Sequence, residues 1–485
     1  MTEDTAISRS GNRLVALVLV CFFLSGVTAL IYQILWTRMA VKIIGGAPLA
    51  VSIILTIFMA GLGLGSYLAG RYLRRAREPA QLVRIYGLLE LGIAGFALLV
   101  PLLLALFTPV YSVIYNQLFS HFWLYSMITF IGCALIFLMP VVLMGATLPV
   151  LSRFYVTRLS HLGTHVGQLY GLNTIGAAAG AFVCGFWLIN SLGVWGTMVV
   201  AVALNSLIGI ACLLAGRKTA SGSPAEKPEP AQAKSGQPEE PVMARQDPWF
   251  TKGVLLIFAV SGFSSMAYEV IWTKLLGLIV GPTTYSFTIV LVTFILGLAL
   301  GSILFGWLAD KTGKPFGLLI TTQIIAALSV LFVSQLLGDS QLFFAKLIFE
   351  FKDNFSLLNL AKGGALFFIM LFPTLCLGAA FPLVGKIYTQ SIARVGTCIG
   401  NAYAINTVGA VLGAFSAGFL LIPLLGKEQG LSLVVALQLA IALLVGAGTL
   451  LQRKESLLKI AALSTACLSG LFLTFHFPAW NHTLL

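Results

Sequence analysis

Two carboxylates fall within segments that are otherwise apolar enough to cross a membrane. Of the 16 Asp and Glu residues, these are Glu90 and Glu269, whereas the others lie in one polar stretch, in loops or near the termini. An ionisable side chain inside a bilayer is costly and usually faces a cavity or a partner. Glu90 and Glu269 are therefore candidates for binding a cation or carrying a proton.

Both carboxylates also have a structural interpretation. A buried Glu can join helices through hydrogen bonds, and Lys274 follows Glu269 closely enough in the chain to pair with it near the outer boundary of the membrane. The sequence leaves the functional and the structural interpretation open for each residue.

The chain contains an internal repeat that exchanges carboxylates for amides. At an offset of 236 residues Gln33 aligns with Glu269, and at an offset of 233 residues Glu90 aligns with Gln323. Each half thus supplies one carboxylate and one amide at swapped positions. This arrangement suits a cation or a proton bound between two pseudo-symmetric halves.

Aromatic pairs accompany this segment in both halves. Tyr32 and Trp36 are four residues apart, as are Tyr268 and Trp272, so each pair shares one helix face. Beside a carboxylate they would form an aromatic wall for an ammonium group. The alternative is that they belong to the belt of aromatic residues at the membrane interface.

Further polar residues recur in the two halves. They are Tyr170, Asn173 and Thr174 in the first half, and Tyr403, Asn406 and Thr407 in the second. These groups either hold helices together or line a polar path, and the sequence does not separate the two roles. We include Asn173 and Asn406 among the candidate binding residues.

The elements that must position these residues are transmembrane helices. The chain has 485 residues, of which 59% are hydrophobic and 9% charged, and a mean hydropathy of +0.98. These values exclude a soluble globule. Continuous apolar runs of about twenty residues predict helices rather than barrel strands. We predict spans near residues 14–36, 48–71, 83–106, 124–149, 167–191, 195–215, 253–276, 284–307, 316–337, 362–385, 400–424 and 430–450, with a thirteenth near 459–477.

The net charge of +13 is explained by membrane topology. Arginine and lysine recur in every second loop, so by the positive-inside rule these loops and the N-terminus are cytoplasmic. We expect a multi-pass protein of the cell inner membrane that contacts lipid and no nucleic acid. The scattered cysteines and histidines have no ligand-like spacing, so neither a metal site nor a cofactor is expected.

The repeat defines the predicted domains. Residues 1–216 and 250–452 form two parallel six-helix bundles, related by an axis along the membrane normal. Residues 217–249 are rich in Pro, Ala, Ser, Glu and Lys and predict a disordered cytoplasmic linker. Residues 453–485 would supply the extra helix and an external tail.

Glycine-rich segments favour close packing of helices, because bare backbone at one-turn spacing permits contact where lipid offers no hydrophobic drive. The stretch Gly301–Lys314 continues such a segment into a basic loop and resembles a signature of the major facilitator superfamily. The resemblance implies a cytoplasmic gate latch formed by Asp310, Lys311 and Lys314. The equivalent stretch in the first half keeps the glycines and basic residues, including Arg71, but has no acid.

A second resemblance rests on the motif Ser25-Gly26-x-x-Ala29-Leu30-x-Tyr32-Gln33-x-x-Trp36-x-Arg38 and the glycines that follow between Gly61 and Gly70. It is similar to the membrane domain of the fused major facilitator and spermidine synthase-like family. Those proteins carry a soluble aminopropyltransferase domain, whereas this sequence contains no alternating strands or nucleotide-binding turn. We therefore do not expect enzymatic activity.

The sequence predicts an all-α, polytopic membrane protein that resembles the major facilitator superfamily. The leading functional hypothesis is a secondary transporter for a small cationic or amine-bearing solute, such as a polyamine, with proton coupling as an option. The alternative is a non-transporting scaffold or accessory subunit for a separately encoded enzyme of the spermidine synthase-like or another class.

Overall fold

The computed structural model describes residues 3–44, 47–72, 78–221, 247–279, 284–338, 340–452 and 456–476. Within these ranges every regular element is a helix. The first half comprises α1 (Glu3–Ile44), α2 (Ala47–Tyr72), α3 (Pro79–Leu118), α4 (Phe122–Tyr155), α5 (Leu162–Val183) and α6 (Ile189–Ser221), with the π-helical segment η2 (Cys184–Leu188) between α5 and α6.

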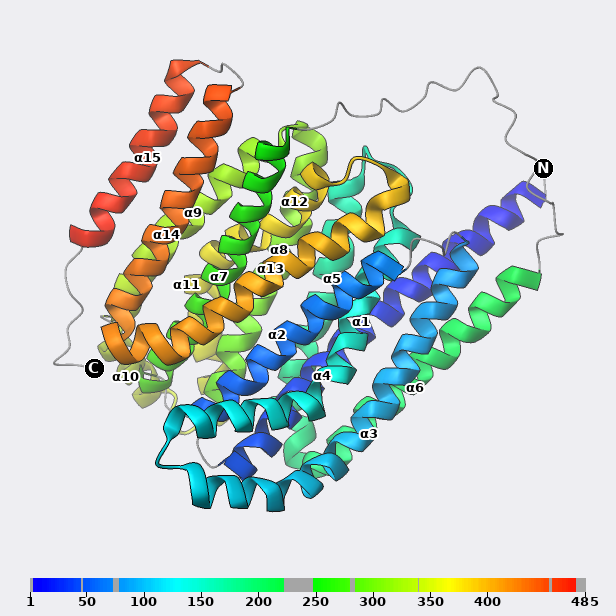
Figure 1. The fold of residues 1–485 in the computed structure, drawn as a ribbon, viewed down its shortest axis with the longest axis horizontal. Helices are drawn as coiled ribbons and strands as arrows, with labels where there is room; N and C mark the ends of the chain where they lie inside the picture. Colours follow the sequence, from blue (N-terminus) through cyan, green and yellow to red (C-terminus); the bar gives the residue numbers. More distant parts are fainter. Residues whose placement is uncertain are drawn as a thin grey trace.

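The second half repeats this arrangement with additional breaks. It comprises α7 (Pro248–Ile279), α8 (Thr284–Thr312), α9 (Pro315–Gly338), α10 (Gln341–Glu350), α11 (Phe355–Gly378), α12 (Ala380–Tyr388), the 3₁₀ turn η3 (Ile392–Arg394), α13 (Val395–Ser416), the π-helical segment η4 (Ala417–Leu421), α14 (Ile422–Gln452) and the extra helix α15 (Leu457–His476). Figure 1 shows the first half, coloured from blue through cyan to the green of α6, beside the second half, in green to orange.

In the described part of the chain, eleven helical stretches are long and apolar enough to cross a membrane. The two longest, of 56 and 61 residues, would each exceed a bilayer of about 30 Å more than twofold if they were straight. Each is broken at a glycine in the left-handed region, Gly193 with φ +67° and Gly426 with φ +78°, a conformation that glycine adopts without steric cost. Each stretch therefore makes two crossings, as predicted.

Some predicted segments differ from the structure in detail. The tenth predicted span, 362–385, is divided between α11 and α12. Residues 111–118 continue α3, and the end of α3 and the start of α4 run across the other helices (Figure 1). Residues 217–221 of the predicted linker are helical, and residues 222–246 lie outside the described part of the chain, as does the predicted tail from residue 477.

Glycine permits the close helix packing within each half. A Cβ atom on Gly65 of α2 would overlap the carbonyl oxygen of Val142, and one on Gly301 of α8 would overlap that of Leu375. Because Gly65 aligns with Gly301 and Val142 with Leu375, the two halves use one packing solution.

The halves contact each other through two repeat-related helix pairs, α5 with α8 and α2 with α13. A Cβ atom on Gly167 would lie 2.5 Å from the carbonyl oxygen of Ser302, and one on Gly400 would lie 2.5 Å from that of Ser66. These contacts lie toward the end of the molecule at which α1 begins. We call it the basic end, because its turns carry Arg71, Arg153, Arg158, Lys311, Lys314, Lys386 and Arg394.

Helix α15 packs outside the twelve-crossing core. It contacts α14 and α9, and Figure 1 shows it beside α14 at one edge of the molecule. Two residues of α14 and one of α9 pack against it, since a Cβ atom on Gly446 would meet Leu463, and one on Gly470 would meet Leu328 and Leu439. The extra helix therefore leaves the interface between the halves unobstructed.

Candidate functional site

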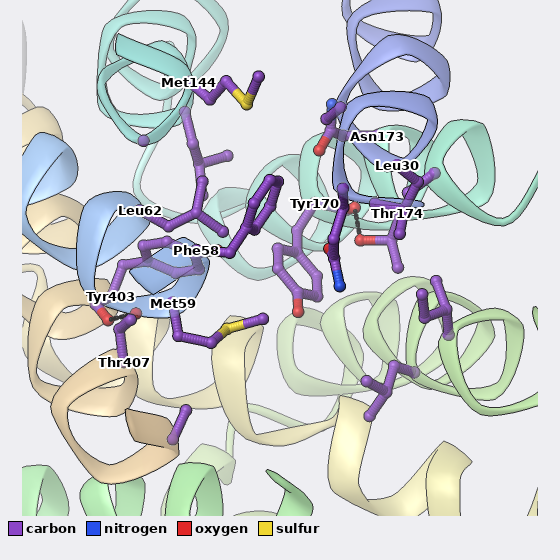
Figure 2. Close-up of a pocket in the computed structure, with 18 of the residues that line it drawn as sticks. Leu30, Phe58, Met59, Leu62, Met144, Tyr170, Asn173, Thr174, Tyr403 and Thr407 are labelled. Atoms are coloured by element: carbon purple, nitrogen blue, oxygen red, sulfur yellow. Dashed lines mark hydrogen bonds between the residues drawn. The ribbon is translucent and has the colours of Figure 1, made fainter. Parts of the chain in front are cut away.

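A cavity of about 200 Å³ lies between the two halves. Helices α1, α2, α4 and α5 of the first half and α7, α8 and α13 of the second half line it. Its apolar wall includes Phe58, Met59, Leu62 and Met144, which Figure 2 shows around the pocket. Among the described residues that line this cavity, Glu269 is the one acidic or basic side chain.

Glu269 and Gln33 both line the cavity, so the structure brings this repeat-related pair together at the interface of the halves. Gln33 is largely buried, at 9% exposure, whereas Glu269 is half-buried. Tyr170 lies close enough to Glu269 for an electrostatic interaction. Within the described residues, Glu269 forms no ion pair with Lys274, so the anticipated structural pairing of these two residues is absent.

Asn173 and Asn406 also line the cavity, and each ties two helices together. Asn173 Nδ2 donates to the carbonyl oxygen of Phe22 at 2.9 Å, and Asn406 Nδ2 donates to that of Phe258 at 2.8 Å. The first bond joins α5 to α1, and the second joins α13 to α7. The two asparagines therefore fix the helices that carry Gln33 and Glu269.

An aromatic cluster lies on the basic-end side of these polar groups. Ring centroids of Tyr170 and Phe381 are 4.7 Å apart, those of Phe381 and Tyr403 are 5.7 Å apart, and those of Tyr170 and Tyr403 are 6.5 Å apart. Both tyrosines line the cavity (Figure 2). The cluster includes residues from both halves, and we call it the aromatic floor of the cavity.

Glu90 lies elsewhere, inside the first bundle. Its side chain is fully buried, and its Oε2 accepts a hydrogen bond from Asn205 Nδ2 at 2.5 Å. Tyr32 donates to Asn205 Oδ1 at 3.4 Å. Glu90 is not among the cavity-lining residues, but Ser25, which does line the cavity, lies beside it.

The second bundle repeats this buried triad with amides. Tyr268 donates to Gln438 Oε1 at 2.8 Å, and Gln438 Nε2 donates to Gln323 Oε1 at 3.0 Å. Gln323 is 1% exposed. The structure thus places Tyr32, Glu90, Tyr268 and Gln323 in the packing of the bundles, and it separates them from Glu269 and Gln33.

The two tryptophans also lie inside the bundles. Trp36 stacks on Tyr32 with ring centroids 5.3 Å apart, and Trp272 stacks on Tyr268 at 6.1 Å. Both indoles have no exposed surface. The interpretation that they form an interfacial belt is therefore wrong, because belt residues must reach the lipid headgroups. They are not among the residues that line the cavity.

A latch at the basic end joins the halves through Asp310. Its carboxylate accepts hydrogen bonds from the backbone amides of Gly163 and Thr164, at 3.2 and 2.7 Å. These amides belong to the first turn of α5, where unpaired N–H groups and the helix dipole favour an anion. Lys386 Nζ of α12 lies 2.5 Å from Asp310 Oδ1 and also donates to the carbonyl oxygens of Leu159 and Ser160.

The other predicted gating residues lie outside this network. Lys311 Nζ is 4.7 Å from the ring centroid of Trp307, and Lys314 is exposed. Arg71 Nη1 donates to the Tyr67 hydroxyl at 3.4 Å on the exposed surface. Lys386 provides the basic group of the latch instead.

Three residues of these networks were not predicted from the sequence as site residues, namely Asn205, Gln438 and the latch residue Lys386. A signal for the first two existed, because Asn205 aligns with Gln438 at the offset of 233 and both are polar positions in apolar helices. Lys386 aligns with Arg153, so alignment alone gave no reason to pair it with an acid. In the described part of the chain no group of three or more His, Cys, Asp or Glu residues could hold a metal ion.

Similar folds occur among solved transporter structures. The human organic anion transporter MFSD10 (TETRAN) superposes with a TM-score of 0.56 at 12% identity, over 90% of this chain and 99% of that one. A bacterial homologue of the iron transporter ferroportin, outward-facing with soaked iron, has a TM-score of 0.52 at 13% identity, over 89% and 97%. A further structure of a bacterial homologue of the iron transporter ferroportin, in an outward-facing state, has a TM-score of 0.52 at 14% identity, over 89% of this chain and 97% of that one.

The likeness is confined to structure. No protein-family model and no curated protein sequence matches the chain. At these identities the comparisons show a fold of the major facilitator type, and any statement about cargo must come from the residues of the cavity.

Proposed function

We propose that the protein is a secondary transporter that moves a small amine-bearing solute through the central cavity by alternating access of its two halves. The observation that carries the proposal is Glu269, a carboxylate without an ion-pair partner among the described residues, which lines a cavity between the halves. A buried charge without a partner is unfavourable, and an ammonium group would supply one. The structural neighbours are titled as carriers of different cargoes, an organic anion and iron, so the charge in the cavity is the better guide.

The gate of this transporter is the latch at the basic end. Asp310 and Lys386 hold α8 and α12 against the start of α5, and the aromatic floor lies between this latch and the cavity. If the positive-inside rule places the basic end in the cytoplasm, the closed gate faces inward in a cell inner membrane. Breaking the latch would then be the step that lets the solute leave on that side.

Glu269 also offers a route to proton coupling. A carboxylate that releases an ammonium group can take up a proton before the empty protein returns, which avoids moving a bare charge through the membrane. Polyamines and other amines are then the first class of solutes to test.

The proposal is tested with Glu269→Gln, which keeps the size and much of the hydrogen bonding of the side chain but removes the charge. Uptake into proteoliposomes is measured for polyamines, amino acids and amine drugs, together with the melting temperature in detergent. We expect near-normal melting and a loss of uptake, with binding weakened by about 2–5 kcal/mol, as for a charge pair that loses one member.

The matched control is Glu350→Gln, the same change on an exposed carboxylate at the end of α10. It should alter neither melting nor uptake. Unchanged uptake by Glu269→Gln would contradict the proposed site. A wild-type protein that moves none of the solutes would instead favour the non-transporting scaffold.

A further inference from the structure

A second cavity of about 200 Å³ adjoins the central one, and its lining carries two opposite charges. Gln33 and Glu269 line both cavities, so they stand where the two meet. The second cavity continues away from the basic end, because Thr273 and Lys274, which also line it, follow Glu269 along α7.

Glu269 and Lys274 face this cavity without pairing with each other. They are five residues apart on α7, a rise of about 7.5 Å along the helix axis, and no ion pair joins them. Both side chains are half-buried. A carboxylate and an ammonium group that line one small cavity at this spacing can each receive one end of a ligand.

The residues around Glu269 and Lys274 indicate which charged group of a ligand would bind to each of them. Lys427 of α14 lies close enough to Lys274 for electrostatic repulsion, so this side of the cavity favours an anionic group. No second acid lines either cavity among the described residues, so Glu269 alone favours a cation. A diamine would satisfy Glu269 but would place its second ammonium group near Lys274, whereas a simple acid would satisfy Lys274 but would meet Glu269.

We propose that the solute is a small zwitterion, with its ammonium group on Glu269 and its acid group on Lys274. A ligand of this kind neutralises both half-buried charges at once, whereas a ligand of one sign leaves the other uncompensated. Both charged residues lie on α7. The first half supplies no equivalent pair, because Gln33 stands at the position equivalent to Glu269 and Arg38, the equivalent of Lys274, is not among the residues that line the cavity. This inference rests on the proposed transport function, and it narrows the solute class of the same site.

The test uses matched probes, each of which lacks one of the two charged groups of an amino acid. Each of the amino acids alanine, leucine and phenylalanine is compared with its decarboxylated amine and with its deaminated acid. Binding to the purified full chain is measured by the shift in melting temperature over a concentration series, and uptake is measured in proteoliposomes. We expect at least one amino acid to bind about 30-fold or more tightly than both of its single-charge analogues, as for the loss of one member of a buried charge pair.

Variants locate the two ends of the ligand. Lys274→Gln should lose binding of the amino acid but not of its amine, and Glu269→Gln should lose binding of both. Lys274→Arg keeps the charge and should retain binding, which separates loss of charge from misfolding. Lys252→Gln, the same change at an exposed position of α7, is the control and should behave as wild type.

Two results would overturn the zwitterion assignment in distinguishable ways. If amines bind as tightly as the amino acids and Lys274→Gln changes nothing, the solute is a simple cation, and the proposed function at Glu269 stands. If no probe binds and neither these probes nor polyamines are taken up, both the zwitterion assignment and the transport proposal fail.

Discussion

The two halves of the chain share their backbone contacts but differ in their charges. Gly65 and Gly301 admit the same close approach of helices within each half, and the pairs α5–α8 and α2–α13 repeat the same contact between the halves. In contrast, the second half has Glu269 where the first has Gln33, and the first half has Glu90 where the second has Gln323. The packing of the helices is therefore symmetric between the halves, whereas the positions of the carboxylates are not.

The inter-half contacts at the basic end show the same division. On the α5–α8 side the Asp310 carboxylate and Lys386 join the halves. On the α2–α13 side the Thr397 hydroxyl donates to the carbonyl oxygen of Gly70 at 2.7 Å, and the positions equivalent to Asp310 and Lys386 are both arginine, Arg74 and Arg153. Among the described residues, the first contact thus includes an ion pair, and the second includes a neutral hydrogen bond.

The largest effects should come from the shared scaffold. We expect Gly65→Leu and Gly301→Leu each to destabilise the protein by about 3 kcal/mol or more, because the new side chain would overlap a backbone carbonyl that cannot move freely. Gly95→Leu and Gly317→Leu, at positions with open space around the Cβ atom, are the controls. If the melting temperature fell for only one of the two glycine variants, the inference that the two halves pack in the same way would be contradicted.

The next effect concerns the charged contact. Asp310→Asn removes the charge that Lys386 and two backbone amides of α5 bind. We expect a loss of about 1.5–3 kcal/mol for hydrogen bonds to a charged group. Labelling of a cysteine introduced at Ser265, which lines the cavity outside the aromatic floor, by a reagent added at the basic end, should become faster. Asp353→Asn, an exposed residue of the turn between α10 and α11, should leave the labelling rate unchanged.

The fold was largely predictable because its signals are local and repeated. Long apolar runs set the helices, and the offsets of 236 and 233 residues set the two halves. The turns at Gly193 and Gly426 fall where the predicted spans 167–191 and 400–424 end. The division of the tenth span into α11 and α12 was not predicted, since its first-half counterpart α4 is continuous.

The site was only partly predictable, because a sequence does not say which way an intramembrane polar residue faces. Gln33 and Glu269 face the cavity between the halves. Their direct neighbours Tyr32 and Tyr268 lie on another face of the same helices and hydrogen-bond within each bundle. From residue type alone, all four residues were predicted to share one site. Successive residues of a helix are rotated by about 100° about its axis, so each Tyr faces away from the neighbouring Gln or Glu.

A smaller effect should follow from the neutral contact between the halves. Thr397→Val keeps the shape of the side chain but removes its hydrogen bond to Gly70. We expect a loss of about 0.5–1.5 kcal/mol in melting experiments, less than for Asp310→Asn. If Thr397→Val were the more damaging of the two, charge would not be what distinguishes the two contacts between the halves at the basic end.

The smallest effect on stability is expected for a substitution of Glu90. This residue allows a direct comparison of the two halves, because Gln323 occupies the equivalent position in the second half. Its Oε2 accepts a hydrogen bond from Asn205, and in the second half Gln323 Oε1 accepts the corresponding bond from Gln438. Glu90→Gln can reproduce this arrangement, because an amide oxygen is an equivalent acceptor. We therefore expect melting to change by no more than about 1 kcal/mol.

Uptake decides what the Glu90 carboxylate is for. Because Glu90 does not line the cavity, Glu90→Gln should reduce uptake far less than Glu269→Gln, measured side by side in the same proteoliposomes. If instead Glu90→Gln melts normally and abolishes uptake, its charge acts in transport across the wall formed by Ser25, which lies beside Glu90 and lines the cavity. The first bundle would then contribute an ionisable group of its own to transport. Glu90 in the first half and Glu269 in the second half would have different roles in transport, and Glu269 would not act alone.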